Sequence, residues 1–252
     1  MIDLSSQVAL ITGGSRGIGA ATATMLAKAG ADVAIVYREN YKSAVKVIRS
    51  IEQNGRSGFA LRGNIVNYTD CRNIANKVIK KFGRIDILVN NAGIWEYGEI
   101  GKMTEKDWKK TIDINLTGTF NMCNIIVPIM KRQKYGRIIN ISSTAGQRGE
   151  AFHSHYAASK GGIIAFTRSL GPELIKDGIW VNCVAPGWVD TGMVAAEIKN
   201  PSTKKEISQS IPRGKVGKPE EIAGPIVFLA SSLADHIVGE ILNVNGGSTL
   251  CG

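Results

Sequence analysis

Short apolar runs alternate with longer amphipathic stretches along the chain. Seven runs rich in β-branched residues are predicted as strands, at 8–13, 32–37, 58–63, 85–90, 137–142, 180–185 and 241–245. Six stretches with helical spacing lie between them, at 17–29, 41–53, 70–82, 104–131, 155–176 and 219–231. The strands are apolar almost throughout, which indicates a sheet that is covered on both faces. The pattern predicts a single-domain α/β fold of the Rossmann type, with a doubly wound parallel sheet of seven strands and helices on both faces.

Local signals refine this outline at two helix starts and in one long connection. Thr104 and Asp107 have the spacing of a capping box, and Pro219 can occupy the first position of its helix. The segment of about 188–218 is long and polar and follows the carboxyl end of a strand. A long irregular connection at that place is typical of a lid over a ligand. We therefore expect residues 1–252 to form one domain that carries a substrate lid.

Composition excludes several classes of protein. Hydrophobic residues make up 44% and charged residues 21% of the 252 positions, as in ordinary globular domains. No apolar run approaches the ~20 residues of a membrane span, and no basic segment precedes the first apolar run as in a secretory signal. The cysteines at 71, 123, 183 and 251 form no CxxC pair. We expect a cytoplasmic protein with reduced cysteines, no metal site and no membrane contact.

The net charge of +10 raises the question of an acidic partner. The densest basic run comprises Lys131, Arg132, Lys134 and Arg137, and it lies where a predicted helix ends. Cations at a helix C-terminus are favoured by the macrodipole, so a solvated helix end explains the run. The alternative is a docking patch for an acidic carrier or a coenzyme phosphate. Nucleic acid is not expected, because aromatic and basic residues are not interleaved.

The first predicted strand leads into TGGSRGIG, and a helix follows at once. Glycines at such a turn permit positive φ and let the backbone approach a pyrophosphate, while the free N–H groups of the helix start face the anion. This strand–turn–helix context predicts a dinucleotide site. Its residues are Gly13, Ser15, Arg16, Gly17, Ile18 and Gly19.

The end of the second strand predicts which dinucleotide is bound. An acidic residue that would bind a ribose 2′-hydroxyl is expected there, but the chain has Tyr37 followed by Arg38. Arg38 and Arg16 can both bind a 2′-phosphate, and one charge-assisted hydrogen bond contributes about 1.5–3 kcal/mol. Glu39 opposes this effect in part. The sequence therefore predicts NADP(H) rather than NAD(H).

Two further motifs follow predicted strands. The fourth strand ends in NNAG, where Asn91, Ala92 and Gly93 leave room for a flat ligand and form a second wall of the cleft. Tyr156 and Lys160 lie one helical turn apart and share a helix face. A lysine charge ~6 Å away at a dielectric of ~20 contributes ~3 kcal/mol, or about two pKa units, so it would lower the pKa of the phenol. Tyr156 could then exchange a proton with a carbonyl oxygen that Ser143 holds.

Taken together, these motifs closely resemble the short-chain dehydrogenase/reductase family over nearly the whole chain. TGGSRGIG, NNAG, Ser143, the Tyr156–Lys160 pair, the APG at 185–187 and Asn115 in DINLTG match in order and spacing. Ser143 is preferred to Ser142 because it lies thirteen residues before Tyr156, as in the family. The chain is most similar to the 3-oxoacyl-carrier-protein reductase branch. It departs from the family at Asn64, where an aspartate is common, and in NVNGG.

The resemblance implies roles for these residues. Tyr156 would be the acid/base, Lys160 would hold the ribose, Ser143 would orient the substrate and Asn115 would keep a water in a proton relay. It also implies a homotetramer built on the long helices and the C-terminal strand. Further cofactor contacts implied by the family are Asn64, Ile65, Asn91, Ala92, Gly93, Tyr156, Lys160, Pro186, Gly187, Val189 and Thr191.

Substrate contacts in this family come from the turn after NNAG, the loop before the tyrosine and the lid. Here these segments contribute Trp95, Gln147, Glu150, His153, Trp188 and Met193. The two tryptophans favour an apolar pocket, and Glu150 would disfavour an anionic substrate. His153 and His155 are expected in a solvent-facing loop, and Met193 could equally pack within the lid.

Three functions remain open at this point. The first is NADPH-dependent reduction of a 3-oxoacyl thioester, carried by acyl carrier protein or CoA. The second is reduction or oxidation of free small ketones, secondary alcohols or polyols. The third is a dinucleotide-sensing protein without catalysis, which the complete set of Ser143, Asn115, Tyr156 and Lys160 disfavours.

Overall fold

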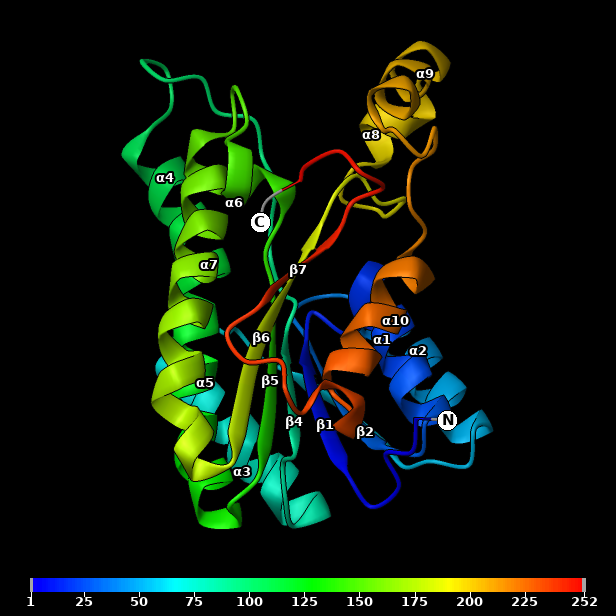
Figure 1. Ribbon diagram of the computed structural model, residues 1–252, viewed down its shortest axis with the longest axis vertical. Coiled ribbons are helices and arrows are strands. Elements are labelled where there is room, and N and C mark those ends of the chain that lie inside the picture. Colours follow the sequence, from blue (N-terminus) through cyan, green and yellow to red (C-terminus); the bar gives the residue numbers. More distant parts are fainter. Residues whose placement is uncertain (1, 251–252) are drawn as a thin grey trace.

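A seven-stranded sheet forms the centre of the protein (Figure 1). The computed structural model describes residues 2–250. The strands are β1 (Val8–Thr12), β2 (Asp32–Tyr37), β3 (Gly58–Arg62), β4 (Ile87–Asn90), β5 (Gly136–Ile141), β6 (Ile179–Pro186) and β7 (Ile241–Val244). All neighbours are parallel, in the order β3-β2-β1-β4-β5-β6-β7. The predicted doubly wound Rossmann-type fold is confirmed.

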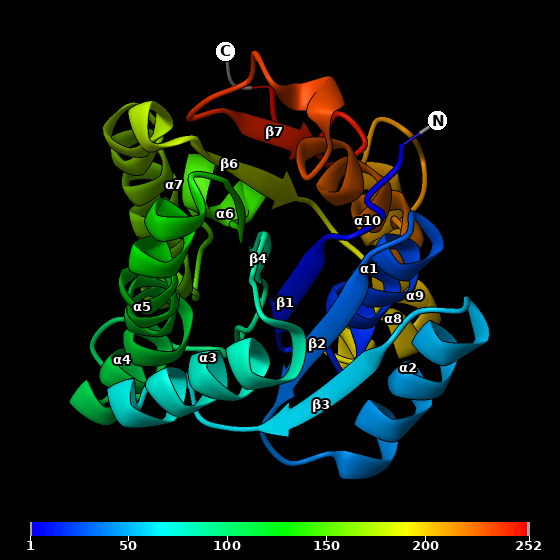
Figure 2. The ribbon, with the colours of Figure 1, turned by 90° about the horizontal axis from the view of Figure 1, so that it is seen from below.

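Two layers of helices cover the sheet (Figure 2). Helices α1 (Gly17–Lys28), α2 (Tyr41–Gln53) and α10 (Pro219–Leu229) lie on one face. Helices α3 (Tyr68–Phe82), α5 (Gly118–Gln133) and α7 (Ser154–Leu174) lie on the other, with α4 (Glu105–Ile112) beside them. Three short helices complete the set: α6 (Thr144–Arg148), α8 (Ala195–Lys199) and α9 (Pro201–Ser210).

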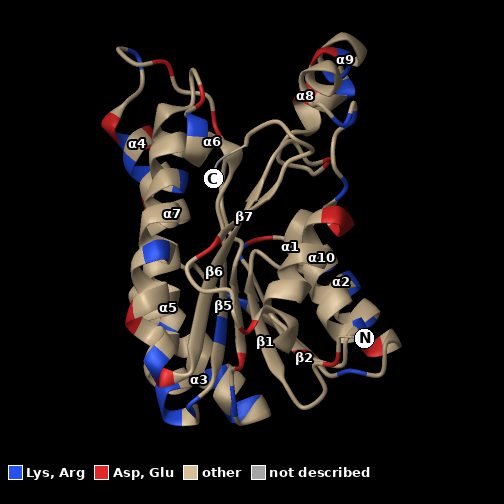
Figure 3. Ribbon diagram, viewed as in Figure 1, with Lys and Arg blue, Asp and Glu red and all other residues tan. Residues whose placement is uncertain are grey.

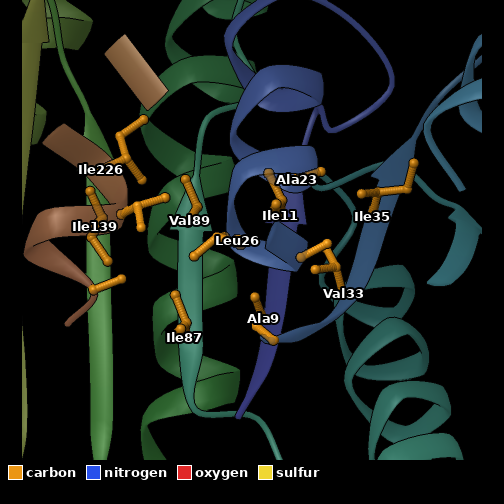
Figure 4. Close-up of a cluster of buried hydrophobic side chains, with 14 of the residues drawn as sticks. Ala9, Ile11, Ala23, Leu26, Val33, Ile35, Ile87, Val89, Ile139 and Ile226 are labelled. Atoms are coloured by element: carbon orange, nitrogen blue, oxygen red, sulfur yellow. The ribbon is translucent and has the colours of Figure 1, made fainter. Parts of the chain in front are cut away.

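The strands are apolar on both sides because each side has its own core. Along β1, Ala9 and Ile11 belong to the cluster under α1 and α10, drawn in Figure 4, whereas Val8 and Leu10 belong to the cluster under α3 and α5. Ala9, Leu10 and Ile11 are completely buried. Successive side chains of a strand point to opposite faces, so a run of apolar residues serves both cores.

Both predicted helix starts are confirmed, but the predicted helix 104–131 is wrong as one element. Thr104 Oγ1 accepts a hydrogen bond from Asp107 N and Asp107 Oδ2 accepts one from Thr104 N, each 3.2 Å long, and Pro219 opens α10. A π-helical turn, Asp113–Thr117, separates α4 from α5. Such wide turns are frequent at functional sites, and this one contains Asn115.

The segment 188–218 is not one irregular loop, because it contains α8 and α9, which stand apart from the sheet in Figure 1. Its two ends are joined by backbone hydrogen bonds from Gly217 N to Trp188 O (2.9 Å) and from Asp190 N to Gly217 O (2.8 Å). Ile207 and Ile211 are buried. The segment also contacts the chain after β7, because Arg213 N donates to Gly246 O at 3.0 Å and Ile211 packs beside Gly246.

The basic run at the end of α5 is not a continuous charged surface. Lys131 pairs with Asp177 at 2.7 Å. Arg137 is 2% exposed, pairs with Asp235 and lies 4.1 Å from the centre of the Trp180 ring. Figure 3 shows basic and acidic residues mixed over the helices. The run is therefore mostly used within the fold.

Other expectations concern cysteines, membrane spans and metals. Cys71, Cys123 and Cys183 are buried and free, while Cys251 lies outside the described residues. Within residues 2–250, no helix is both long and apolar enough to cross a membrane. The same residues contain no cluster of three or more histidine, cysteine, aspartate or glutamate side chains suited to a metal ion.

Candidate functional site

A cavity of about 1170 Å³ opens at the carboxyl ends of the central strands. This edge is where parallel α/β sheets bind ligands. Most of the residues singled out in the sequence line it: Gly13, Ser15, Arg16, Gly17, Ile18, Tyr37, Arg38, Asn64, Ile65, Asn91, Ala92, Gly93, Trp95, Ser143, Glu150, Tyr156, Lys160, Pro186, Gly187, Trp188, Val189, Thr191 and Met193. Gly19, Asn115, Gln147 and His153 are not among the lining residues.

The glycine loop has the shape that a pyrophosphate requires. Gly13 has a φ of +63°, and a Cβ there would lie 2.9 Å from Ala92 Cα. A Cβ on Gly19 would lie 2.4 Å from Gly13 O, so this glycine lets α1 start directly behind the loop. Arg16, the N-cap of α1, makes no side-chain capping bond, which leaves the first N–H groups of the helix available to an anion. The loop therefore fits a dinucleotide.

Thr12 and Asn91 hold the glycine loop against the end of β4. Asn91 Nδ2 donates to Thr12 O at 3.0 Å and to Gly13 O at 3.1 Å. Thr12 Oγ1 accepts from Asn91 N at 3.0 Å and from Ala92 N at 3.1 Å. The sequence predicts Asn91 as a site residue but not Thr12. The position of Thr12 directly before the glycines is the signal that could have indicated its role in holding the loop.

The glycine loop also contacts the start of the segment 188–218. A Cβ on Gly17, which has a φ of +53°, would lie 3.2 Å from Thr191 Cγ2. Thr191 Oγ1 accepts a hydrogen bond from Met193 N at 3.3 Å. The start of this segment thus packs on the loop that faces the cavity.

Three cations lie at the end of the cavity beside β2. Arg16 and Arg38 are exposed, and Arg38 Nε lies 3.8 Å from Glu39 Oε1 in a loose surface pair. Lys42, in the first turn of α2, lines the same cavity and was missed in the sequence. With the strand ending in Tyr37, the local charge favours an anionic ligand group.

The third strand is followed by Asn64, where the family often has aspartate. Its Oδ1 accepts a hydrogen bond from Val66 N at 3.2 Å, and its own N donates to Asp70 Oδ2 at 3.0 Å. Ile65 is buried. The asparagine thus shapes the turn that forms one cavity wall.

Tyr156 and Ser143 meet inside the cavity. Tyr156 is in the first turn of α7 and is 8% exposed, and its hydroxyl lies close enough to that of Ser143 for the serine to influence its pKa. Burial raises the pKa of Tyr156 to about 12, the Ser143 hydrogen bond lowers it, and the Glu150 charge raises it further. The phenol therefore holds its proton at neutral pH.

Lys160 lies behind the tyrosine ring, with Nζ 5.7 Å from the ring centre. Its ammonium donates to Ile141 O at 2.8 Å, and burial lowers the pKa of Lys160 to about 8. The expectation that the pKa of Tyr156 lies below its ordinary value is wrong. Desolvation of the buried phenolate is the largest effect on this pKa, and it raises the value.

Ser142 and Ser143 point to different partners. Ser142 is buried and its Oγ donates to Lys160 O at 2.8 Å, which links the residue after β5 to α7. Ser143 is the N-cap of α6, and its Oγ accepts from Ala145 N at 3.2 Å while it faces Tyr156. Of the two serines, Ser143 has its hydroxyl beside the phenol.

Asn115 braces the site from outside the cavity. Its Oδ1 accepts from Ile94 N at 2.8 Å, and its Nδ2 donates to Ile94 O and to Ser159 Oγ, both at 3.0 Å. Ser159 Oγ in turn donates to Tyr156 O at 2.7 Å. The amide thereby joins the loop after β4 to the first turn of α7.

The expected substrate residues divide into two groups. Trp95, Glu150, Trp188 and Met193 line the cavity. Gln147 instead donates to Asn243 Oδ1 at 2.6 Å, because α6 turns its side chain towards β7. His153 does not line the cavity but stacks on Trp95.

His155 also differs from the expectation of a solvent-facing loop. It is completely buried, and neither ring nitrogen has a hydrogen-bond partner. Burial lowers its pKa, so the ring remains neutral. A Cβ on Gly98 would lie 3.0 Å from His155 Cε1, which shows how closely the ring packs under the loop after β4.

Further lining residues were not recognised in the sequence. Ile94 and Arg148 lie at the substrate end, as do Glu96 and Lys110, which pair at 2.6 Å. Ile94 directly follows NNAG, which was a usable signal. Lys110 is distant from NNAG in the sequence, and its position on α4 brings it to the cavity.

The geometry agrees with what comparison with known proteins shows. A family profile described as "Enoyl-(Acyl carrier protein) reductase" matches residues 13–249. A 3-oxoacyl-(acyl-carrier-protein) reductase from Synechocystis sp. is 41% identical over 99% of this chain and 100% of its own length. The chain belongs to the short-chain dehydrogenase/reductase family.

Other members of the family are similarly close. The 3-oxoacyl-(acyl-carrier-protein) reductase FabG of Thermotoga maritima is 40% identical, with 97% of this chain and 98% of the relative covered. The crystal structure of levodione reductase superposes with a TM-score of 0.92 at 29% identity, over 96% of this chain and 97% of that one. The crystal structure of gox2181 gives a TM-score of 0.94 at 34% identity, over 98% and 97%. This short-chain dehydrogenase/reductase is therefore an oxidoreductase that uses a nicotinamide dinucleotide.

Proposed function

We propose that the protein uses NADPH to reduce a carbonyl group to a secondary alcohol, and that the natural substrate is a 3-oxoacyl thioester. One observation carries the proposal: the buried Tyr156 lines the same cavity as Ser143, Lys160 and the glycine loop, with Lys160 Nζ 5.7 Å from its ring centre. The curated relatives named 3-oxoacyl-(acyl-carrier-protein) reductase support the substrate class.

The side chains can supply the proton chemistry of this reaction. The bound coenzyme supplies a hydride to the carbonyl carbon. Tyr156 donates its proton to the carbonyl oxygen, and the raised pKa of the phenol keeps that proton available at neutral pH. The Ser143 hydroxyl donates a hydrogen bond to the same oxygen as negative charge develops there.

Lys160 and Asn115 have supporting roles in this proposal. Lys160 has a pKa of about 8, so its ammonium is still largely charged at pH 7 and can bind a ribose hydroxyl. Asn115 holds the loop after β4 against α7, and by family resemblance it keeps a water through which the proton is replaced.

NADP(H) preference is supported by the charges beside β2. No carboxylate occupies the end of the strand, and Arg16, Arg38 and Lys42 line that part of the cavity. Glu39 also lines it and reduces the effect. A 2′-phosphate placed there would accept charge-assisted hydrogen bonds, each about twice as strong as a neutral one.

The basic run at 131–137 does not support docking of an acyl carrier beside the cavity. Lys131 and Arg137 are engaged within the fold, and the run lies at the amino end of β5, opposite the cavity edge.

We propose residues 188–218 as the substrate lid, because four residues at the start of this segment line the cavity: Trp188, Val189, Thr191 and Met193.

A second candidate is reduction of free small ketones. The rings of Trp95 and Trp188 form an aromatic wall on the substrate side, which is suitable for a compact apolar ketone. Levodione reductase is among the solved relatives. Both candidates use the same proton chemistry and differ only in what the substrate wall accepts.

Assembly is proposed to follow the family as a homotetramer. Phe120 on α5 and Trp108 on α4 are 46% and 41% exposed, and Phe120 contacts Phe166 of α7 with ring centres 6.5 Å apart. Phe120 and Phe166 lie on the long helices that the family uses for association, and Trp108 lies on the shorter α4. Exposed large apolar side chains on adjacent helices are typical of a protein interface.

The test is a comparison of coenzymes and substrates. Oxidation of NADPH and NADH is measured with acetoacetyl-CoA, acetoacetyl-acyl carrier protein and a panel of free ketones and cyclic diketones. The proposal expects the highest kcat/KM with NADPH and a thioester. Turnover of free ketones alone would favour the second candidate, and binding of NADPH without any turnover would favour a sensing protein.

A further inference from the structure

Two tryptophans from different strand ends meet across the substrate side of the cavity. Trp95 follows β4, Trp188 follows β6, and β5 lies between these strands in the sheet. The ring centres are 5.8 Å apart and the rings are nearly perpendicular, at 80°. Both rings line the cavity together with Ser143, which directly follows β5. The pair therefore bridges the cavity over the strand that positions the reacting groups.

Trp95 is held in place by two contacts besides Trp188. Its indole stacks on the His153 ring, with centres 4.4 Å apart and planes within 4°. Its Nε1 donates to Glu150 Oε1 at 3.2 Å. One face of the Trp95 indole and its N–H group are thus both in contact with other side chains. The ring therefore cannot change its position without losing the stack and the hydrogen bond.

His153 is itself fixed by the backbone. Its Nδ1 lies 3.0 Å from Ala151 O, and its backbone pairs with Gly98 in an isolated parallel bridge. The Tyr97 ring packs edge-on against it, with centres 6.1 Å apart. His153 does not line the cavity, so this side chain acts on the substrate through the lining residues that it contacts, which are Trp95 by stacking and Glu150 at 3.8 Å.

We propose that the Trp95–Trp188 pair limits the length of the acyl group, and that His153 is a positioning residue that keeps the limit rigid. This inference rests on the proposed reduction of 3-oxoacyl thioesters. The cavity of about 1170 Å³ has to hold a dinucleotide as well as the substrate, and the two rings in contact occupy part of its substrate side. A short acyl group fits beneath the pair, whereas a long chain requires the two rings to separate.

The experiment measures kcat/KM with NADPH for acetoacetyl and 3-oxododecanoyl thioesters of the same carrier. The wild type is expected to favour acetoacetyl by roughly tenfold or more, the scale at which a closed apolar pocket discriminates. Trp95→Ala and Trp188→Ala should each bring the ratio close to one. Circular dichroism and thermal unfolding show whether each variant is folded, and either variant alone is enough for the test.

His153 gives a readout that a purely structural role would not produce. His153→Ala frees one face of Trp95 and should lower the KM for the long substrate several-fold, with kcat on acetoacetyl thioester within about twofold of wild type. His153→Phe keeps an aromatic ring against the indole and should restore the wild-type length profile. Equal loss of activity on both substrates in His153→Ala, without rescue by phenylalanine, would contradict the positioning role.

The failure of this inference is distinguishable from that of the proposed function. A wild-type enzyme that reduces both thioesters equally well overturns the length limit and leaves thioester reduction intact. A wild-type enzyme that reduces free ketones but neither thioester overturns both. A strong preference for acetoacetyl thioester that both tryptophan variants retain also overturns the length limit.

Discussion

The Lys160 ammonium donates to the Ile141 carbonyl oxygen at 2.8 Å. This bond ties α7 to the end of β5, and it orients the charge between the strand and the Tyr156 ring. The lysine is therefore a structural element of the site before any ligand binds. Within residues 2–250 no carboxylate forms an ion pair with this buried ammonium, and burial lowers the pKa of Lys160 to about 8.

Tyr156→Phe removes the only hydroxyl proton donor that this mechanism uses and keeps the ring. We expect kcat to fall by about 10²–10⁴, the usual contribution of a positioned general acid. The Kd for NADPH, measured by fluorescence titration, should stay within about twofold because the glycine loop is untouched. Weak coenzyme binding together with residual turnover would show that the residue has a different role.

Arg38→Asp should shift coenzyme preference. The substitution removes a cation at the end of β2 and places a carboxylate there, which repels a 2′-phosphate and can accept hydrogen bonds from ribose hydroxyls. The ratio of kcat/KM for NADPH to that for NADH should fall by tenfold or more, since one charge-assisted hydrogen bond contributes about 1.5–3 kcal/mol. Arg49→Asp on α2, outside the cavity lining, is the matched charge control. An unchanged ratio in Arg38→Asp would refute the phosphate site.

Gly19→Ala should damage the glycine loop. The added Cβ would lie 2.4 Å from Gly13 O, a backbone atom that cannot move without distorting the loop. We expect a loss of about 1–3 kcal/mol in the free energy of unfolding and a weaker Kd for the coenzyme. Gly224→Ala on α10 meets no atom within 4 Å and should be neutral or stabilising by up to about 1 kcal/mol. Similar urea denaturation midpoints for both variants would show that the packing estimate is wrong.

His155 should make stability depend on pH below neutrality. Burial and the His153 charge lower its pKa, and Glu96 and Asp107 oppose this effect. The unfolded chain, with an ordinary histidine pKa of about 6.5, binds the proton more readily than the folded protein. Stability contributed by the neutral ring is therefore complete above about pH 6.5 and is lost progressively as the pH falls below it.

This pH effect is measured by urea unfolding at several pH values between neutral and mildly acidic. The drop in unfolding free energy should be smaller in His155→Phe than in the wild type. His236→Gln, at an exposed position, is the control and should keep the wild-type pH profile. A His155→Phe profile parallel to that of the wild type would assign the acid sensitivity to other groups.

Much of the fold was predictable because strands and helices in this sheet have clear periodicities. The strand at 32–37 and the helix at 41–53 match β2 and α2 at both ends. The predicted strand at 85–90 starts two residues before β4, and at that point the buried Asp86 carboxylate accepts hydrogen bonds from Val8 N and from Arg84. The π-helical turn at Asp113–Thr117 was not predictable, since its sequence keeps ordinary helical spacing.

The candidate site was predictable where a sequence motif determines the backbone conformation. It was not predictable where a side chain bonds to a residue that is distant in the sequence. The glycine loop and Tyr156 are set by local geometry, so their places followed from spacing. Gln147 turns to Asn243 across the fold, which no local pattern indicates. The pKa of Tyr156 was misjudged for a similar reason, because the sequence shows the neighbouring lysine but not the extent of burial.

Gly17 and Thr191 are separated by most of the chain, yet they lie next to each other where the proposed substrate lid begins. A coenzyme bound at the turn before α1 would therefore lie beside the start of residues 188–218. Binding of the coenzyme would then order the segment that forms the substrate side. We therefore expect an ordered kinetic sequence in which the dinucleotide binds first and leaves last.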